Sequence, residues 1–461
     1  MAIEGPIKGP FTLWTTAFDL EAQGYVADEY LLSGSARSFR HVSEPTDDGH
    51  WLVDAVDSKD FVTRLVLNRP ADMRSFSGSV WIEWLNVSGG LDAAPGWLYS
   101  HRQLMRSGDV WVGASAQKVG IDGGGLGLDM HLKAVDPERY GRLKHPGDAY
   151  CYDIFTEASE AIRDKFGLAG STSGPLLAIG SSQSAMALVT YANAIDPHAK
   201  AIDGYLIHGR GAEGMPLDGG YIPFQYGEHR AGRHRIRNDA RVPVLTVQSE
   251  TDVALLGGGR ARQPDTDNVR LWEVAGAAHF DAYGLHASLY DDGGRTPHEL
   301  AGLVAAEGIT KPASGRPYNR GWQMHYVLQS ALVHLADWAS VKRMPLGAAP
   351  RLMSADADAL TFVADDQGLA RGGVRTPWVD VPTAVHSGLR EQGEGTPYDA
   401  LFGETVAFEP GVLERLYPRH RAEYLERFAI ALESAVQSGF VLADDVAEVM
   451  AVADLEWPGL G

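Results

Sequence analysis

Short apolar segments alternate with helix-periodic segments along most of the chain. Runs of strand length, rich in β-branched and aromatic residues, occupy positions 61–70, 79–85, 109–115, 175–180, 201–209, 242–249 and 269–276. Apolar residues at helical spacing occupy positions 96–107, 148–166, 183–194, 321–341 and 418–437. This alternation is typical of a mostly parallel sheet covered by helices. We therefore expect an α/β fold with a central sheet.

Two stretches depart from this alternation. Residues from about 211 to 240 are rich in glycine, arginine and aromatic residues, and we expect a cap-like insertion that covers a pocket. The region from about 346 to 461 starts with a glycine- and proline-punctuated segment that fits a hairpin, and it continues with helices. It is either a separate module or a flap on the main body. Because no repeat and no long linker divides the chain, we expect a packed C-terminal extension and a single domain over residues 1–461.

The sequence GSSQS at 180–184 interrupts an apolar run and is followed by small and aliphatic residues. A strand that turns sharply into a helix can present a nucleophilic serine, provided that small residues stand two positions before and after it. Gly180 and Ser184 fulfil this condition around Ser182, although glycine is usual where Ser184 stands. The pattern predicts Ser182 as a nucleophile. A serine-rich loop before a helix N-cap would look similar.

Two further segments supply partners for Ser182 in the order acid, then histidine. Glu250 and Asp252 follow the apolar run 242–249, and His279 follows the run 269–276. Carboxyl ends of parallel strands meet at one edge of a sheet, where such folds place their sites. We favour Asp252 as the acid, with Glu250 as the alternative because its longer side chain could reach the imidazole.

An acyl-transfer site also needs donors for the developing oxyanion. The backbone N–H of Gln183 is one candidate, since it follows the predicted nucleophile. Gly89 and Gly90 are candidates for the second donor, because they lie in the loop after an early strand. Asn86 in the same loop is a candidate for the substrate pocket. An ordinary Gly-Gly turn is the simpler interpretation of this loop.

The expected cap contributes candidate pocket residues. Tyr221, Phe224 and Tyr226 are aromatic residues in the insertion and predict an apolar acyl or alcohol pocket. Arg210 precedes the insertion and is a candidate contact for a substrate carboxylate. It is also a candidate partner for Glu83, whose carboxylate inside an apolar strand is costly unless it is paired.

Composition and charge exclude several classes of function. The formal net charge is −20, which disfavours nucleic acid and anionic membrane surfaces as partners. Cys151 is the only cysteine, so an intrachain disulfide is excluded. The chain shows neither a signal-peptide pattern at its start nor an apolar run of membrane-spanning length, and we expect a cytoplasmic protein.

Motifs for cofactors and metals do not fit. The glycine-rich segment 121–129 lacks the spacing of a dinucleotide-binding loop, and the sequence contains no P-loop motif. His279, Asp281 and His286 match no zinc-site spacing. We expect no cofactor and no metal.

The sequence also resembles a known family. The segments that carry the resemblance include EWLNVSGGLDAAPGW, HPGDAYCYDIF, GSSQSA, RQPDTDNVRLWEVAGAAHFDAYG, GGVRTPWVDVPTA and LFGETVAF. They are similar to an α/β-hydrolase domain family whose nucleophile elbow reads G-E-S-Q-S-A. The resemblance runs from about residue 10 to the carboxyl end and implies one catalytic unit. It implies roles for Ser182, Gln183 and His279 and leaves the acid within 249–252 open. Ser181 stands where the family usually has glutamate.

These observations together predict a cofactor-free serine hydrolase that cleaves a small-molecule carboxylic ester through an acyl-enzyme. Cleavage of a lactone or an amide, and acyl transfer to another acceptor, would use the same triad. Two competing hypotheses are a hydrolase-fold protein that only binds a ligand and a metal-dependent enzyme. The sequence leaves assembly into a homo-oligomer open.

Overall fold

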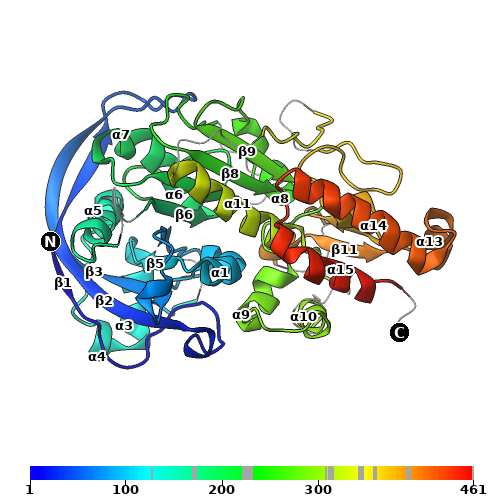
Figure 1. The fold of residues 1–461 in the computed structure, drawn as a ribbon. Coiled ribbons are helices and arrows are strands. Elements are labelled where there is room, and N and C mark those ends of the chain that lie inside the picture. The colour runs from blue at the N-terminus through cyan, green and yellow to red at the C-terminus, as the bar shows by residue number, and fades with distance from the viewer. Residues whose placement is uncertain are drawn as a thin grey trace.

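A nine-stranded sheet runs through the part of the chain that the structure describes (Figure 1). The structure, a computed structural model, describes residues 1–125, 128–168, 174–220, 232–306, 309, 316–340, 347–356, 361–390 and 396–458. The strand order is β1-β2-β3-β5-β4-β6-β7-β8-β9. The strands are β1 (Ala2–Glu4), β2 (Tyr25–His41), β3 (Val53–Pro70), β4 (Val80–Trp84), β5 (Val110–Ala114), β6 (Leu176–Ser181), β7 (Gly204–His208), β8 (Val244–Ser249) and β9 (Val269–Val274).

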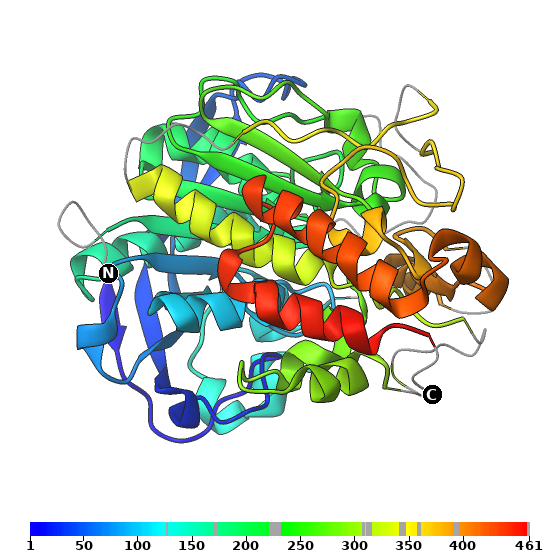
Figure 2. The same cartoon turned by 45° about the vertical axis from the view of Figure 1, so that its right-hand side comes forward.

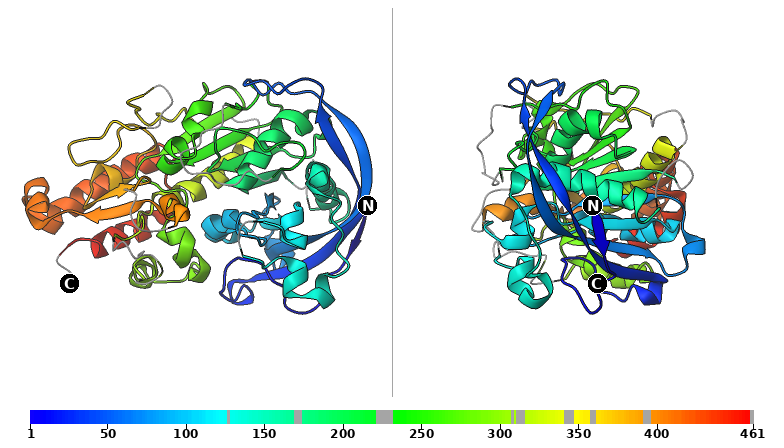
Figure 3. Two further views of the ribbon diagram at one scale, coloured as in Figure 1. Left: turned by 180° about the vertical axis from the view of Figure 1, so that it is seen from behind. Right: turned by 90° about the vertical axis from the view of Figure 1, so that its left-hand side faces the viewer.

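The strands from β4 to β9 pair in parallel, whereas β1, β2 and β3 form an antiparallel edge. The parallel strands coincide with apolar runs of the sequence, so the expected mostly parallel α/β sheet is confirmed. The sequence pattern missed β2 and the first half of β3, which form a long curved ribbon along one side (Figures 1 and 3). Residues 54–60 of β3 are exposed, so no apolar alternation marks them.

Helices flank the sheet. Up to residue 254 they are α1 (Pro95–Ser107), α2 (Lys118–Asp122), α3 (Leu132–Val135), α4 (Pro137–Tyr140), α5 (Cys151–Asp164), α6 (Gln183–Thr190), α7 (Asp196–Ala199) and α8 (Glu250–Ala254). They continue with α9 (Ser288–Tyr290), α10 (Pro297–Val304), α11 (Gln323–Ser340), α12 (Pro377–Asp380), α13 (Pro410–Leu416), α14 (His420–Gln437) and α15 (Val446–Leu455). Among the described residues, none of these helices combines the length and the apolar character needed to cross a bilayer.

Two hydrophobic clusters cover the two faces of the sheet. Because side chains alternate along a strand, neighbouring residues of β4 enter different clusters. Trp81 packs in the cluster that contains Trp97 of α1 and the apolar face of α11. Trp84 packs in the other cluster, against Phe155 of α5. The burial of both faces explains why the central strands read as continuous apolar runs.

The C-terminal extension shares the first of these clusters, as expected from the sequence. Figure 2 shows α14 and α15 lying beside α11 on one face of the molecule. The Trp378 ring stacks on Tyr326 of α11 and meets Phe428 of α14 edge-on, with centroid distances of 5.6 and 5.4 Å. Two short antiparallel strands, β10 (Ala384–Ser387) and β11 (Glu404–Ala407), belong to the same extension.

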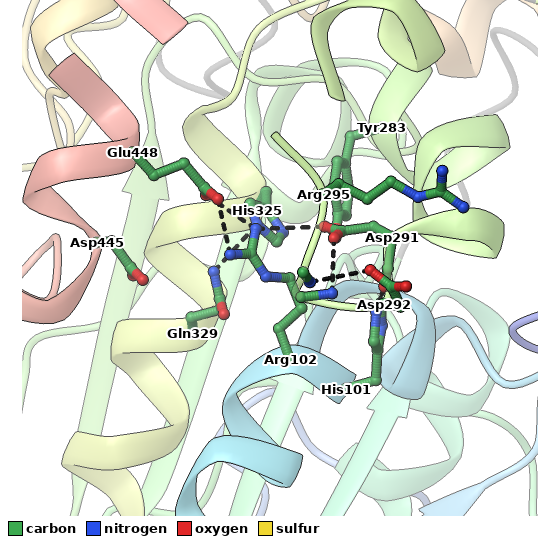
Figure 4. Close-up of polar contacts among 12 residues, drawn as sticks. His101, Arg102, Tyr283, Asp291, Asp292, Arg295, His325, Gln329, Asp445 and Glu448 are labelled. Carbon is green, nitrogen blue, oxygen red and sulfur yellow. Dashed lines mark hydrogen bonds and ion pairs between the residues drawn. The ribbon is translucent and has the colours of Figure 1, made fainter. Parts of the chain in front are cut away.

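A buried ion pair joins the last helix to the first. Arg102 of α1 donates two hydrogen bonds to the carboxylate of Glu448 in α15, each 2.8 Å long. Asp291 contacts the same guanidinium at 3.3 Å, and Tyr283 donates to Asp291 at 2.9 Å. Figure 4 shows Arg102 between the two carboxylates, with α1, α11 and α15 meeting around it. Tyr326 of α11 also donates to Glu448, at 2.8 Å, so three helices share this carboxylate.

Candidate active site

The turn between β6 and α6 is sharp and strained. Ser182 stands between strand and helix with φ 60° and ψ −120°, a left-handed conformation that costs about 1–3 kcal/mol in a residue other than glycine. A Cβ atom at Gly180 would lie 2.7 Å from the Ser184 carbonyl oxygen and 2.9 Å from Leu188. Strand and helix therefore approach so closely that only glycine fits at position 180. This geometry directs the side chain of Ser182 out of the turn.

The serine that replaces the usual glycine, Ser184, takes part in the turn. Its hydroxyl accepts a hydrogen bond from the Ser181 N–H at 2.9 Å and donates one to the Ser181 carbonyl at 2.8 Å. The same carbonyl accepts a bond from the Asn86 amide at 2.9 Å. Asn86 therefore holds the elbow backbone, whereas the sequence suggested a place in the substrate pocket.

The structure brings Ser182, His279 and Asp252 into one hydrogen-bonded chain. His279 Nε2 lies 3.0 Å from Ser182 Oγ, and His279 Nδ1 lies 2.5 Å from Asp252 Oδ1. The Asp252 side chain is fully buried, while 10% of the His279 side chain is exposed. Gly209 passes beside the ring, where a Cβ atom would lie 3.2 Å from two imidazole atoms. Its missing side chain leaves room for the imidazole.

Asp252 is fixed from its own helix. Its second oxygen, Oδ2, accepts hydrogen bonds from the Ser249 N–H at 2.6 Å and the Ser249 hydroxyl at 2.8 Å. These contacts belong to a capping box that opens α8, with Ser249 as N-cap. Burial raises the pKa of Asp252, but the neighbouring His279 ring and the hydrogen bonds lower it below its usual value. The carboxylate beside the imidazole therefore stays ionised at neutral pH.

Glu250, the alternative acid, points to other partners. Its carboxylate accepts hydrogen bonds from the Gly276 N–H at 2.6 Å and the Gly388 N–H at 2.9 Å. Burial raises the pKa of Glu250 to about 7, although both N–H groups favour the ionised form. The geometry thus pairs the imidazole with Asp252. Glu250 instead accepts hydrogen bonds from backbone N–H groups of two neighbouring segments.

Behind the triad, His208 at the end of β7 faces Ser181. Its Nδ1 atom lies 3.2 Å from the Ser181 hydroxyl, and its ring meets Tyr99 edge-on at 5.6 Å. Burial lowers the pKa of His208 to about 4, so the ring is neutral at pH 7. The triad therefore has a second imidazole nearby that adds no charge.

The candidate oxyanion donors differ in whether their N–H groups already have a hydrogen-bond acceptor. Gln183 is the first residue of α6, and the N–H of such a residue has no acceptor inside its helix. Gly90 adopts φ 78° and donates its N–H to the Val87 carbonyl at 3.0 Å, so it closes an ordinary turn. Expecting Gly90 as an oxyanion donor is therefore wrong for this conformation.

Other N–H groups of the same loop are also engaged. Leu85 donates to a carbonyl of β5, Asn86 donates to Ala93, and Ser88 donates to the Asn86 side chain. Among the described residues, the structure shows no acceptor for the N–H groups of Val87 and Gly89. Val87, which the sequence did not single out, thus joins Gly89 as a candidate second donor.

Arg210 is committed to backbone carbonyls. The buried guanidinium donates to Gly211 at 2.8 Å, to Ala212 at 2.9 Å and to His234. Burial lowers its pKa to about 10. The suggested pairing with Glu83 is wrong, since Arg210 donates its hydrogen bonds to backbone carbonyls of the insertion instead.

Glu83 has partners of its own. Its carboxylate accepts from the N–H groups of Gly96 and Trp97 at 2.7 and 2.9 Å, and from the Trp111 indole at 2.9 Å. The first two donors are at the start of α1, where backbone N–H groups lack helical acceptors. Burial raises the pKa of Glu83 to about 8.

The expected pocket residues Tyr221, Phe224 and Tyr226 lie outside the described residues. The part of the insertion that is described touches the elbow through Met215. The Gln183 amide donates to Gln117 at 2.8 Å and lies 3.1 Å from the Met215 sulfur. Sequence reasoning singled out neither Gln117 nor Met215, and no motif marks them.

The residues considered as metal ligands, Asp281 and His286 among them, form hydrogen bonds with separate partners. Asp281 accepts from the Tyr99 hydroxyl at 2.9 Å, and His286 Nδ1 lies 2.9 Å from the Leu303 carbonyl oxygen. Within the described part of the chain, the structure groups no three His, Cys, Asp or Glu side chains in a way that could hold a metal ion.

Comparison with known families identifies the family of the chain. The chain matches the family described as "Alpha/beta hydrolase domain" over residues 3–451. The chain belongs to this family. The match includes most of the C-terminal extension. A search of curated proteins found no match.

Solved structures similar to this alpha/beta hydrolase include other hydrolases. A putative dienelactone hydrolase from Klebsiella pneumoniae is 12% identical, with 60% of this chain and 99% of that chain covered and a TM-score of 0.31. An esterase from Pyrococcus furiosus is 10% identical, with 58% and 88% covered and a TM-score of 0.30. A thermostable esterase from Pseudomonas putida is 14% identical, with 63% and 83% covered and a TM-score of 0.29. These values are too low to transfer a substrate.

Proposed function

We propose that this alpha/beta hydrolase is a serine hydrolase that cleaves carboxylic esters, with Ser182 as nucleophile, His279 as base and Asp252 as acid. The observation that carries the proposal is the unbroken chain of hydrogen bonds from Ser182 Oγ through the imidazole to Asp252. A serine hydroxyl is a weak nucleophile unless a neighbouring base accepts its proton. The strained elbow and the ionised, buried Asp252 support the same assignment.

In the proposed reaction, His279 Nε2 accepts the Ser182 proton as Oγ attacks the ester carbonyl. Asp252 then faces a positively charged imidazolium, which its negative charge stabilises. The Gln183 N–H and the N–H of Val87 or Gly89 are the donors that would stabilise the oxyanion, each contributing about 3–4 kcal/mol. His279 returns the proton to the departing alcohol, which leaves an acyl-enzyme. Water activated by the same imidazole releases the acid.

An ester is the substrate class whose cleavage is least demanding for this site. His279 gives its proton to the leaving alcohol, and the ester C–O bond breaks more readily than the resonance-stabilised C–N bond of an amide. Product analysis with added alcohols and amines distinguishes hydrolysis from acyl transfer. A series of p-nitrophenyl esters, lactones and anilides compares the leaving groups.

The direct test is labelling with a fluorophosphonate probe followed by a digest that locates the modified residue. We expect the label on Ser182, because only an activated serine reacts. Ser182→Ala should abolish labelling and lower kcat for an activated ester by about 10⁴–10⁶-fold. Ser159→Ala is the matched control, since the buried Ser159 hydroxyl in α5 only donates a hydrogen bond to the Phe155 carbonyl. Undiminished turnover in Ser182→Ala would refute the assignment.

A further inference from the structure

The loop that carries His279 is enclosed by two other segments of the chain. This histidine loop, residues 275–280, follows β9. On one side lies the start of α8, which carries Glu250, Thr251 and Asp252. On the other side lies the end of β10 in the C-terminal extension, at Ser387 and Gly388.

Glu250 connects all three segments. Its oxygens accept the Gly276 N–H at 2.6 Å and the Gly388 N–H at 2.9 Å, and its own N–H donates to the Ala277 carbonyl at 3.1 Å. The Ser387 hydroxyl adds a longer contact at 3.4 Å. One side chain therefore ties the histidine loop to the extension.

Thr251 reaches the histidine residue itself. Its hydroxyl accepts the backbone N–H of His279 at 3.1 Å and donates to the Gly388 carbonyl at 2.5 Å. Since a hydroxyl has one hydrogen and two lone pairs, both contacts can form together. The same dipeptide, Glu250-Thr251, thus binds both the N–H and the C=O of Gly388.

The extension is fitted tightly against the loop. A Cβ atom at Gly388 would lie 2.2 Å from the Ala277 oxygen and 2.7 Å from the Glu250 Cβ atom, so a larger residue would push the loop away. The Asn319 amide donates to the carbonyls of Gly276 and Ser387 at 2.9 and 3.0 Å. The loop is therefore fixed through its backbone on several sides.

We propose that Glu250 and Thr251 are positioning residues, which use the Ser387–Gly388 backbone of the C-terminal extension to hold the His279 ring within reach of Ser182. This inference rests on the proposed function of the triad. A misplacement of about 1 Å in a catalytic group can lower turnover by about 10²-fold. Glu250, which the sequence offered as an alternative acid, binds the backbone of the histidine loop instead of the imidazole.

The proposal has a consequence for the pH dependence of activity. The ionised carboxylate of Glu250 accepts both N–H groups, whereas the protonated form turns one oxygen into a donor. Burial raises the pKa of Glu250 to about 7, and Arg375 is the charged group that acts on it, in the opposite direction. Asp252 and His279 are the other ionisable groups next to this turn. The acid side of the activity profile should therefore include the protonation of Glu250.

Glu250→Gln tests this, with Glu456→Gln as the matched control. Glu456 is also a carboxyl whose pKa burial raises to about 7, and it accepts two N–H groups, from Trp322 at 2.6 Å and Trp378 at 2.7 Å. We expect Glu250→Gln to lower kcat by about 10–100-fold with KM changed less than about twofold. The acid limb of its log(kcat/KM) profile should have a smaller slope near pH 7 than that of the wild type, because glutamine at position 250 does not titrate. Glu456→Gln should retain the wild-type kcat and slope.

Thr251→Val and Thr251→Ser form a second pair of variants. This pair tests the positioning role in the case that Glu250→Gln does not fold. Valine keeps the shape of the side chain but leaves the His279 N–H without its acceptor. We expect a loss of kcat in Thr251→Val and a recovery of most of it in Thr251→Ser.

The outcomes separate this inference from the proposed function. If wild-type protein is not labelled at Ser182, the proposed function fails and the positioning role fails with it. Labelling at Ser182 together with a wild-type kcat and slope in Glu250→Gln overturns the positioning role alone. An equal loss of kcat in Glu250→Gln and Glu456→Gln also overturns it, because the effect would then be general destabilisation.

Discussion

The two oxygens of Asp252 have separate tasks. Oδ1 contacts the His279 ring, and Oδ2 accepts two hydrogen bonds from Ser249 at the start of α8. Because the capping box fixes one oxygen, the other has little freedom to leave the imidazole. The helix start therefore determines the orientation of the ring.

Asp252→Asn should lower kcat by about 10⁴-fold, because an amide that donates to Nδ1 would favour the wrong tautomer of the imidazole. Ester hydrolysis under saturating substrate measures the effect. Ser249→Ala, which keeps the acid, should reduce the unfolding free energy by about 1 kcal/mol and kcat far less. Near-normal turnover in Asp252→Asn would contradict the role given to this residue.

The sequence alone predicts Ser182 and His279 but does not decide which residue is the acid. Ser182 and His279 follow from strand-end motifs, and the structure places them 3.0 Å apart. Asp252 and Glu250 stand two residues apart on a short helix, where spacing alone does not separate them. The S-x-x-D capping pattern at 249–252 was a usable signal, since it fixes which carboxylate turns back towards the strand end.

At the scale of elements, α1 and α15 depend on each other through Arg102 and Glu448. The Arg102 side chain is 12% exposed and that of Glu448 is 17% exposed. Removal of Arg102 leaves the carboxylates of Glu448 and Asp291 without their shared cation. Such losses are strongly destabilising, whereas replacement of both partners by apolar residues is often neutral.

Arg102→Met should therefore lower the unfolding free energy by about 3–5 kcal/mol, as measured by urea denaturation. Glu448→Ala should lower it less, because Asp291 still contacts the Arg102 guanidinium. If Glu448→Ala were as stable as the wild type, the pair would contribute little to the attachment of α15.

Elements were predicted well where both faces are buried and poorly where they are not. The apolar runs at 79–85 and 109–115 correspond to β4 and β5 almost residue for residue. The sequence missed the exposed half of β3, because a solvated strand needs no apolar alternation. It also missed β2, whose buried positions do not alternate regularly with exposed ones. Contacts such as Glu250 with Gly388, 138 residues apart, leave no trace in local periodicity.

Across the whole molecule, several buried carboxyls carry raised pKa values. Burial raises the pKa of Glu83 to about 8 and those of Glu250, Asp281 and Glu456 to about 7. Between their usual values near 4 and these values, the folded chain binds more protons than the unfolded chain. These carboxyls therefore make the unfolding free energy fall as pH rises through this window, and their contribution levels off above about pH 8.

Burial also lowers the pKa of His208 and His386 to about 4, which acts in the opposite direction below their usual value near 6.5. Urea denaturation at pH 5.5 and pH 8 isolates the carboxyl contribution in a variant. Glu456→Gln should raise the stability at pH 8 relative to that at pH 5.5, compared with the wild type, because glutamine cannot titrate. The same difference in wild type and variant would mean that Glu456 does not contribute.

The pairing of α1 with α15 also bears on how the chain is made. Arg102 and Glu448 are 346 positions apart, so a ribosome delivers the second long after the first. Until then the surfaces that α14 and α15 will cover remain open to water and to chaperones. A nonsense mutation that removes only the last helix should therefore yield an aggregation-prone polypeptide, even though every proposed triad residue has been synthesised.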